Sequence, residues 1–228
     1  MNDSMNTKGG GEVIIKIENL KKSFKDLVVI PGLTRDFKAS ERIAMIGRNG
    51  AGKTTLIRCI LGLYEYEGKI EVMGMNPRKD REIILQNVGF VPQIPPPVKL
   101  TVKEMLSFIS KITATDKNKF IEISTDLGLD VEANLNKPFY KLSGGMKQKL
   151  LVSFALGRSP KILLMDEPSA NLDPAARKIL FEYLENFRKD ALMIISSHRV
   201  DEIETLVNRL IEMDLGQIVV DEPLHNSI

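Results

Sequence analysis

The stretch Gly47-Arg48-Asn49-Gly50-Ala51-Gly52-Lys53-Thr54 decides the fold, because it fills every fixed position of the phosphate-loop pattern G-x-x-x-x-G-K-[ST]. A polyphosphate needs several backbone N–H donors that point inward, and glycine leaves the backbone unobstructed. Lys53 adds a positive charge for the terminal phosphates, and the Thr54 hydroxyl can ligate Mg²⁺. An incidental glycine-rich turn is the alternative. The apolar run at residues 42–46 predicts a buried strand before the loop, and residues 55–61 predict a helix after it, so the stretch indicates a nucleotide site.

Composition limits the class of protein. The chain has 228 residues, 43% of them hydrophobic, which suits one large domain or one domain with a subdomain. A net charge of +2 is too small to indicate a nucleic-acid partner. The single cysteine, Cys59, excludes a disulfide framework and favours a reducing compartment, with a small core residue at that position. No stretch approaches the ~18 apolar residues of a membrane span. Residues 1–11 predict a disordered tail without a secretory signal, so we expect a cytoplasmic protein that reaches a membrane through a partner.

The start of the chain reads as a small antiparallel sheet ahead of the phosphate loop. Strand patterns cover residues 13–17, 27–30 and 33–37, and Pro31-Gly32 is expected to break the chain between the last two. Further strands are predicted at residues 68–73 and 87–92.

Helical spacing of apolar residues then dominates the middle of the chain. Helices are predicted over residues 101–112, 120–129 and 146–156, and they form a helical subdomain inserted into an α/β chain. Beyond it, strands alternate with helices, which predicts a parallel sheet with right-handed crossovers. The predicted strands are residues 162–165, 191–195, 210–213 and 218–220, and the predicted helices are residues 174–187, which start at Asp173-Pro174, and 201–207.

Asp166-Glu167 follows an apolar strand directly. Successive side chains on a strand diverge, so one carboxylate can hold Mg²⁺ while the other faces an attacking water. That division suits hydrolysis of a terminal phosphoryl group, where positioning and charge stabilisation dominate catalysis. A simple turn or helix cap would explain the pair if it stood alone. With a phosphate loop in the same chain, the catalytic interpretation is favoured.

Leu142-Ser143-Gly144-Gly145-Met146 opens the third predicted helix. Ser143 is a predicted N-cap, and the two glycines expose backbone N–H groups, so this turn is a second anion-binding device. An ordinary capped helix is the alternative. A single site does not need two such devices. Their presence suggests a dimer in which each nucleotide lies between one chain's phosphate loop and its neighbour's Ser-Gly-Gly turn.

Together these motifs resemble the nucleotide-binding domain of ABC transporters, from about Ile14 to the end of the chain. All six motifs of that family occur in the family's order. They are the Walker A loop at residues 47–54, the Q-loop Gln93, the signature at residues 142–148, Walker B at residues 162–167, the D-loop at residues 169–173 and the switch residue His198.

The resemblance implies ATP and Mg²⁺ as cofactors and a role for each motif. Glu167 would be the general base or the carboxylate that orients the water, His198 would contact the γ-phosphate, and Gln93 would contact metal and water. Asp173 would organise the dimer seam, and Phe24 would stack on adenine, although a core phenylalanine is the alternative there. The nucleotide-binding residues would be Phe24, Gly47, Asn49, Gly50, Ala51, Gly52, Lys53, Thr54 and Thr55, with Ser143, Gly144, Gly145 and Asp173 at the partner's site, and the Mg²⁺ ligands Thr54, Gln93 and Asp166.

The fold implied is α/β: a P-loop NTPase core with a parallel sheet, an N-terminal antiparallel β subdomain and an inserted helical subdomain. The ATPase domain would cover residues 12–228, with its core at 12–94 and 157–228 and the helical subdomain at about 95–156.

The function implied is an ATPase subunit that dimerises head to tail, with itself or a paralogue, and drives a separate membrane permease on the inner face of the cell membrane. Residues 95–100 and Met105 are the expected permease contacts. The signature resembles the drug-resistance, lipid or polysaccharide exporter branch. One alternative is an ABC-type ATPase acting on nucleic acid or the ribosome, although the chain lacks the coiled coils or second ATPase domain usual there. Another is a phosphate-loop kinase or GTPase, which would leave His198 and the signature without a role.

Overall fold

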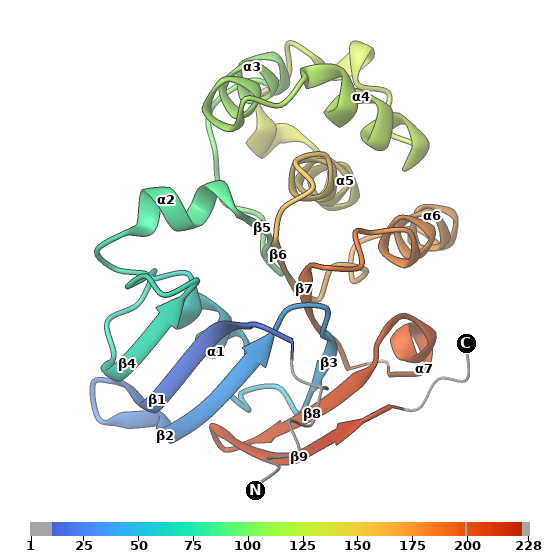
Figure 1. The fold of residues 1–228 in the computed structure, drawn as a ribbon. Helices are drawn as coiled ribbons and strands as arrows, with labels where there is room; N and C mark the ends of the chain where they lie inside the picture. The colour runs from blue at the N-terminus through green and yellow to red at the C-terminus, as the bar shows by residue number, and fades with distance from the viewer. Residues whose placement is uncertain (1–10, 199, 225–228) are drawn as a thin grey trace, which may run out of the picture.

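Two β-sheets pack against α1, the helix that follows the phosphate loop (Figure 1). The computed structural model describes residues 11–198 and 200–224, so Gly11 is the only described residue of the predicted tail. The first sheet has the strand order β2-β1-β4 and the second has the order β5-β6-β7-β3-β8-β9. The strands are β1 (Val13–Phe24), β2 (Leu27–Lys38), β3 (Arg42–Ile46), β4 (Glu67–Val72), β5 (Val88–Val91), β6 (Ile162–Asp166), β7 (Leu192–Ser196), β8 (Arg209–Asp214) and β9 (Gln217–Pro223). The helices are α1 (Lys53–Ile60), α2 (Arg81–Gln86), α3 (Val102–Thr113), α4 (Lys117–Asp126), α5 (Gly144–Leu156), α6 (Pro174–Glu185) and α7 (Val200–Ile203), with 3₁₀ turns at Glu132–Asn134, Phe139–Lys141 and Glu204–Leu206.

The second sheet carries the expected parallel core. Strands β5, β6, β7, β3 and β8 run parallel, and β9 returns antiparallel to β8. Every residue of β6 and β7 is buried, which explains why both read as unbroken apolar runs. The carboxyl ends of parallel strands meet at one edge of the sheet, and ligands bind along that edge in open α/β folds. The segments that follow β3, β5, β6 and β7 are therefore brought together there.

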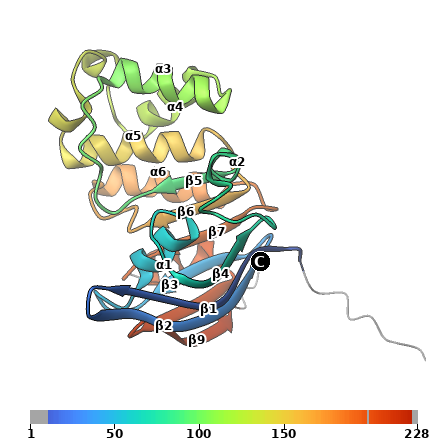
Figure 2. The ribbon, with the colours of Figure 1, turned by 90° about the vertical axis from the view of Figure 1, so that its left-hand side faces the viewer.

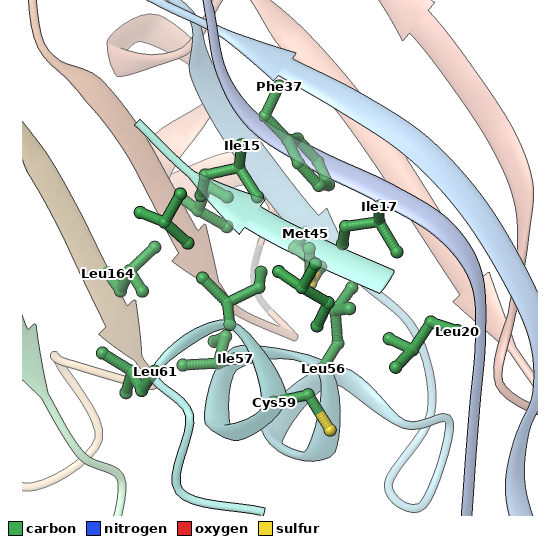
Figure 3. Close-up of a cluster of buried hydrophobic side chains, with 14 of the residues drawn as sticks. Ile15, Ile17, Leu20, Phe37, Met45, Leu56, Ile57, Cys59, Leu61 and Leu164 are labelled. Atoms are coloured by element: carbon green, nitrogen blue, oxygen red, sulfur yellow. The ribbon is translucent and has the colours of Figure 1, made fainter. Parts of the chain in front are cut away.

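Helix α1 lies in the main core between the sheets. Its apolar face meets side chains from both sheets, as Figure 3 shows. The contacts include Leu56, Ile57 and Cys59 of α1, Ile15, Ile17 and Phe37 of the first sheet, and Met45 and Leu164 of the second. Burial raises the pKa of the Cys59 thiol to about 11, and the prediction of a core cysteine is confirmed.

Helices α3, α4 and α5 gather at one end of the molecule, away from the antiparallel sheet (Figures 1 and 2). They have an apolar cluster of their own, which includes Val102, Phe120, Phe139 and Leu150. Helix α3 begins with a capping box, in which Thr101 and Glu104 satisfy each other's backbone N–H groups. The predicted α/β fold class with an inserted helical subdomain is confirmed.

Three details of the predicted secondary structure were wrong or missing. Pro31-Gly32 does not break the strand, because a register shift between the pairs Leu20↔Leu33 and Lys22↔Ile30 accommodates the proline in a bulge. The helix predicted at residues 201–207 is only the single turn of α7, followed by a 3₁₀ turn. Helix α2 was not predicted, because Ile84 is its only buried residue and leaves no apolar period in the sequence.

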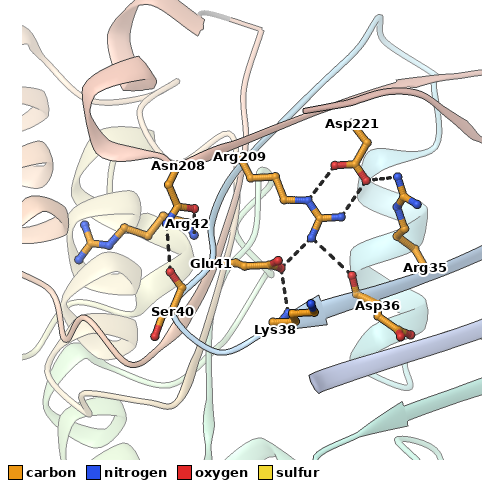
Figure 4. A network of polar contacts seen from close by, with 9 residues as sticks. All are labelled: Arg35, Asp36, Lys38, Ser40, Glu41, Arg42, Asn208, Arg209 and Asp221. Atoms are coloured by element: carbon orange, nitrogen blue, oxygen red, sulfur yellow. Dashed lines mark hydrogen bonds and ion pairs between the residues drawn. The ribbon is translucent and has the colours of Figure 1, made fainter. Parts of the chain in front are cut away.

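A polar network ties the first sheet to the edge of the second (Figure 4). The Arg209 guanidinium donates to both carboxylate oxygens of Asp221 (2.8 and 2.7 Å) and to Glu41 Oε2 (2.7 Å). Arg35 of β2 also contacts Asp221. Burial raises the pKa of Asp221, but the two guanidinium groups outweigh that effect, so the pKa lies below its usual range. The network holds β2 beside β8 and β9 at the end of the second sheet where β3 and β8 begin.

Candidate active site

A pocket of about 370 Å³ opens where the phosphate loop meets the carboxyl ends of β5 and β6. The predicted nucleotide residues of the loop line it together with Gln93, Asp166 and Glu167, although these segments lie far apart in the sequence. The full lining is Leu27, Val29, Asn49, Gly50, Ala51, Gly52, Lys53, Thr54, Thr55, Gln93, Asp166 and Glu167.

The phosphate loop has the backbone that its glycines predict. Gly47 has φ 140°, and a Cβ there would lie 2.2 Å from the Met213 carbonyl oxygen. Gly52 has φ 105° and forms the N-cap of α1, where no side chain caps the helix. The first turn of α1 can therefore offer its N–H groups to an anion. Lys53 Nζ donates to the Gly47 carbonyl (2.6 Å), which holds its charge against the loop.

Asp166 is held by hydroxyl groups on both of its oxygens. Thr54 Oγ1 donates to Oδ2 (2.7 Å) and Ser196 Oγ donates to Oδ1 (2.6 Å), and Asp166 is 2% exposed. Ser196 was not among the predicted site residues. Asp166 and Ser196 are paired in register between β6 and β7. A polar residue at the end of a buried apolar strand, two positions before His198, was the signal that could have found it.

The residues around Asp166 fit a magnesium ion. Thr54, Asp166 and Gln93 supply hydroxyl, carboxylate and amide oxygens, and Mg²⁺ prefers oxygen ligands. Among the described residues, no group of three or more His, Cys, Asp or Glu could enclose a metal ion. Mg²⁺ is usually bound through one or two carboxylates together with substrate phosphates and water, so a donor set with the single carboxylate of Asp166 suits a nucleotide-bound ion.

Glu167 faces a different partner from its neighbour. Glu167 Oε1 lies 2.9 Å from His198 Nδ1, and Glu167 is 6% exposed. The Glu167 backbone has φ 52°, an uncommon conformation for a non-glycine residue, and its N–H donates to the Ser196 carbonyl (3.1 Å). The sharp turn after β6 thus sends Asp166 towards Thr54 and Glu167 towards His198, so the pair contacts two different partners.

The signature turn and the D-loop aspartate lie outside this pocket. Ser143 Oγ accepts from the Met146 N–H (3.2 Å), so the predicted N-cap of α5 is confirmed. Asp173 caps α6 through the Ala176 N–H (2.9 Å) and pairs with Lys149 Nζ (2.8 Å). That ammonium group, together with the cap, lowers the pKa of Asp173 to about 2. Neither these residues nor Gly144 and Gly145 line the pocket of their own chain.

Phe24 also lies outside the pocket lining. Its ring packs edge to face against Tyr64, with centroids 5.1 Å apart, and Lys22 Nζ lies 4.4 Å from its centroid. Leu27 and Val29 of β2 line the pocket instead. Neither residue was predicted from the sequence, and Leu27 is 66% exposed.

Comparison with known proteins gives four findings. The family model described as ABC transporter matches residues 30–170. The chain is 32% identical to the Nod factor export ATP-binding protein I of Rhizobium sp. (strain N33), over 95% of this chain and 73% of that protein. It is 31% identical to the tungstate uptake system ATP-binding protein TupC of Peptoclostridium acidaminophilum, over 90% of this chain and 96% of that protein. A solved structure of the ATP-binding subunit of an ABC transporter has TM-score 0.81 and 26% identity, over 92% of this chain and 90% of that one.

None of the helices described here is long and apolar enough to cross a membrane.

Proposed function

This chain belongs to the ABC transporter family, and from that premise we propose that it is the ATP-binding and ATP-hydrolysing subunit of a transport system. The observation that carries the proposal is the 370 Å³ pocket in which the phosphate loop faces Asp166 and Glu167. A phosphate cradle opposite two separately held carboxylates is what hydrolysis of a terminal phosphoryl group requires. The export and uptake relatives are equally similar to the chain, so this level of identity indicates the subunit type and not the direction of transport.

The site residues have separate tasks in the reaction. The loop amides and Lys53 hold the phosphates, and Thr54, Gln93 and Asp166 hold Mg²⁺, which neutralises phosphate charge when bound. Glu167 orients the attacking water and accepts its proton on a carboxylate oxygen.

His198 keeps that carboxylate in place through the contact between Nδ1 and Oε1 (2.9 Å). Its side chain is 59% exposed, so it can also reach the γ-phosphate of a bound nucleotide.

The active assembly is a head-to-tail dimer with a second copy or a paralogue. Ser143 and Gly144 are exposed and lie outside the pocket of their own chain. They open a thirteen-residue helix, α5, whose N-terminal amides favour an anion. A partner's γ-phosphate is the anion that this turn would bind, so each nucleotide would lie between two chains.

The membrane partner is a permease that docks in an apolar groove of about 480 Å³ between α2, β5, α3 and α5. Met105, one of the predicted contacts, lines this groove although it is only 7% exposed. Strand β5 runs from the groove, at Val88 and Phe90, towards Gln93 in the nucleotide pocket. A permease segment in the groove would therefore lie against the strand that leads to the metal site.

The catalytic part of the proposal is tested by ATP hydrolysis. The wild-type chain is expected to hydrolyse Mg·ATP, and Lys53→Met should lower turnover by about 100-fold because a phosphate-binding charge is lost. Lys178→Met is the matched control, since the Lys178 side chain is 80% exposed on α6 and should leave turnover unchanged. A wild-type chain that neither binds nor hydrolyses ATP would contradict the proposal.

The partner is tested by affinity purification of the tagged chain from a detergent extract, followed by mass spectrometry. We expect a stoichiometric membrane protein with several spans. Ile112→Asp should abolish its recovery, because Ile112 lines the groove and is 53% exposed, so the change can be tolerated by the fold. Ile83→Asp is the control, at an equally exposed position of α2 outside the groove lining. Recovery of ribosomal or nucleic-acid components instead would favour the alternative class of ABC-type ATPase.

A further inference from the structure

Gln148, in α5, is a fully buried amide whose side chain makes one hydrogen bond within the described part of the chain. Its Nε2 donates to the Pro168 carbonyl oxygen (3.0 Å), and the residue is 0% exposed. Its Oε1 is buried and has no hydrogen-bond partner among the described residues. Burying an acceptor without a partner destabilises a fold, whereas methionine would fill a similar volume without that cost. The bond to Pro168 is therefore what the amide contributes at this position.

Pro168 belongs to the turn that carries Glu167. The Ala170 N–H donates to the Glu167 carbonyl (3.2 Å) and closes the turn, and the Glu167 N–H is held by Ser196 on β7. Glu167 itself has φ 52°, a conformation that persists in a non-glycine residue only where the surroundings fix it. The bond from Gln148 is the contact that fixes this turn from the side of α5.

Two further contacts join the same face of α5 to the residues after Pro168. A Cβ on Gly145 would lie 2.9 Å from the Asn171 carbonyl oxygen, so helix and loop backbones approach closely there. Lys149 pairs with Asp173 at 2.8 Å. Positions 145, 148 and 149 are three and four residues apart, so they share one side of the helix. The start of this helix is the Ser-Gly-Gly turn, so the turn and the loop after Glu167 are joined within one chain.

We propose that Gln148 is a positioning residue for ATP hydrolysis, which fixes the turn at Pro168 and thereby the orientation of the Glu167 carboxylate. Through α5 it also ties that carboxylate to the Ser-Gly-Gly turn. The inference rests on the proposed ATPase function and gives Gln148, the last residue of the signature at 142–148, a task in the chemistry that was not among the predicted roles.

The test is the variant Gln148→Met in the full-length chain. We expect kcat to fall about tenfold. The Kd for ATP should stay unchanged, because Gln148 does not line the nucleotide pocket. The Tm should change little, because methionine removes a buried acceptor that has no partner but also leaves the Pro168 carbonyl without its donor.

Ser153→Ala is the matched control on the same helix. Ser153 is also fully buried, but its hydroxyl bonds to the Leu150 carbonyl and to Ser124, so its loss should lower the Tm and leave kcat within twofold. Gln148→Leu serves as a second variant without an amide and should give the same loss of kcat.

A double variant separates positioning from a structural role. In the Glu167→Gln background, Gln148→Met should not slow the residual single-turnover hydrolysis further, because the group that it positions is absent. A tenfold additional loss in that background, or a wild-type kcat for both Gln148 variants, would overturn the inference. An inactive wild-type chain would instead count against the proposed function itself, so the two failures are distinguishable.

Discussion

Glu167 and His198 are joined side chain to side chain at the nucleotide pocket, with Oε1 and Nδ1 2.9 Å apart. The carboxylate is almost completely buried, whereas the imidazole is 59% exposed. The exposed His198 imidazole thus holds the buried Glu167 carboxylate in place. A ligand that contacts this imidazole can therefore affect the position of the carboxylate.

The first prediction concerns this carboxylate. Glu167→Gln should lower kcat by at least about 100-fold, because an amide cannot accept the water's proton. ATP should bind as before, since the phosphate loop is unchanged, and the variant should accumulate as an ATP-bound dimer in size-exclusion chromatography. Glu132→Gln, at an exposed position of the helical subdomain, is the control and should behave as wild type. Normal turnover of the Glu167 variant would refute the catalytic assignment.

The second prediction concerns Ser196. Ser196→Ala removes the donor to Asp166 Oδ1 and should raise the Kd for Mg²⁺ in the presence of ATP by about tenfold, because outer hydrogen bonds orient metal-binding carboxylates. Titration of hydrolysis with Mg²⁺ measures this shift. Excess Mg²⁺ should restore most of the rate. A variant with an unchanged Mg²⁺ requirement would show that the Ser196 bond does not orient Asp166 for the metal.

The third prediction distinguishes Leu27 from Phe24 as the side chain that contacts the nucleotide base. Leu27→Ala should weaken ATP binding by about tenfold, because it removes an apolar side chain from the pocket lining. Phe24→Ala should change the Kd less than threefold, because the Phe24 ring packs on Tyr64 and Lys22. Isothermal titration calorimetry gives both values. The reverse order would support the predicted stacking of adenine on Phe24.

The fourth prediction follows from the low pKa of Asp173. Lys149→Met should raise this pKa from about 2 towards the ordinary 3.8, because the main group that lowers it is removed. A carboxylate whose pKa is lowered on folding stabilises the fold above its unfolded pKa and loses that effect as the pH falls through the folded value. The Tm difference between wild type and variant should therefore be constant above about pH 4 and shrink between pH 4 and pH 2. A difference independent of pH over this range would exclude the ion pair as its cause.

The fifth prediction concerns the network between the sheets. Arg209→Met leaves Asp221 and Glu41 without their shared partner and should lower the free energy of unfolding by about 2 kcal/mol. Arg78→Met is the comparison, since Arg78 forms a solvent-exposed pair with Glu65 and should change stability by less than about 0.5 kcal/mol. Chemical denaturation of both variants measures the difference. Equal effects would show that the partly buried network adds nothing beyond a surface pair.

Much of the fold could be predicted because its signals are local. The buried strands β6 and β7 read as apolar runs, and the capping residues Ser143 and Asp173 mark helix starts that the structure confirms. The short helix α2 and the continuous strand β2 could not be predicted. Strand β2 continues through Pro31 because it pairs with β1, and this pairing outweighs the local preference of proline. Helix α2 has one buried residue, Ile84, so its packing leaves no apolar pattern in the sequence.

The sequence by itself determined the nucleotide site, because residues 47–54 form one contiguous phosphate loop whose backbone N–H groups bind the phosphates. It also placed two acidic residues at the end of a buried strand. Only the tertiary structure decided which groups hold them. Ser196 reaches Asp166 through strand register, Gln148 reaches the turn after Glu167 from α5, and β2 rather than an aromatic ring lines the pocket. These contacts join segments far apart in the chain, and side-chain direction at such contacts is fixed by packing and register, which no local pattern encodes.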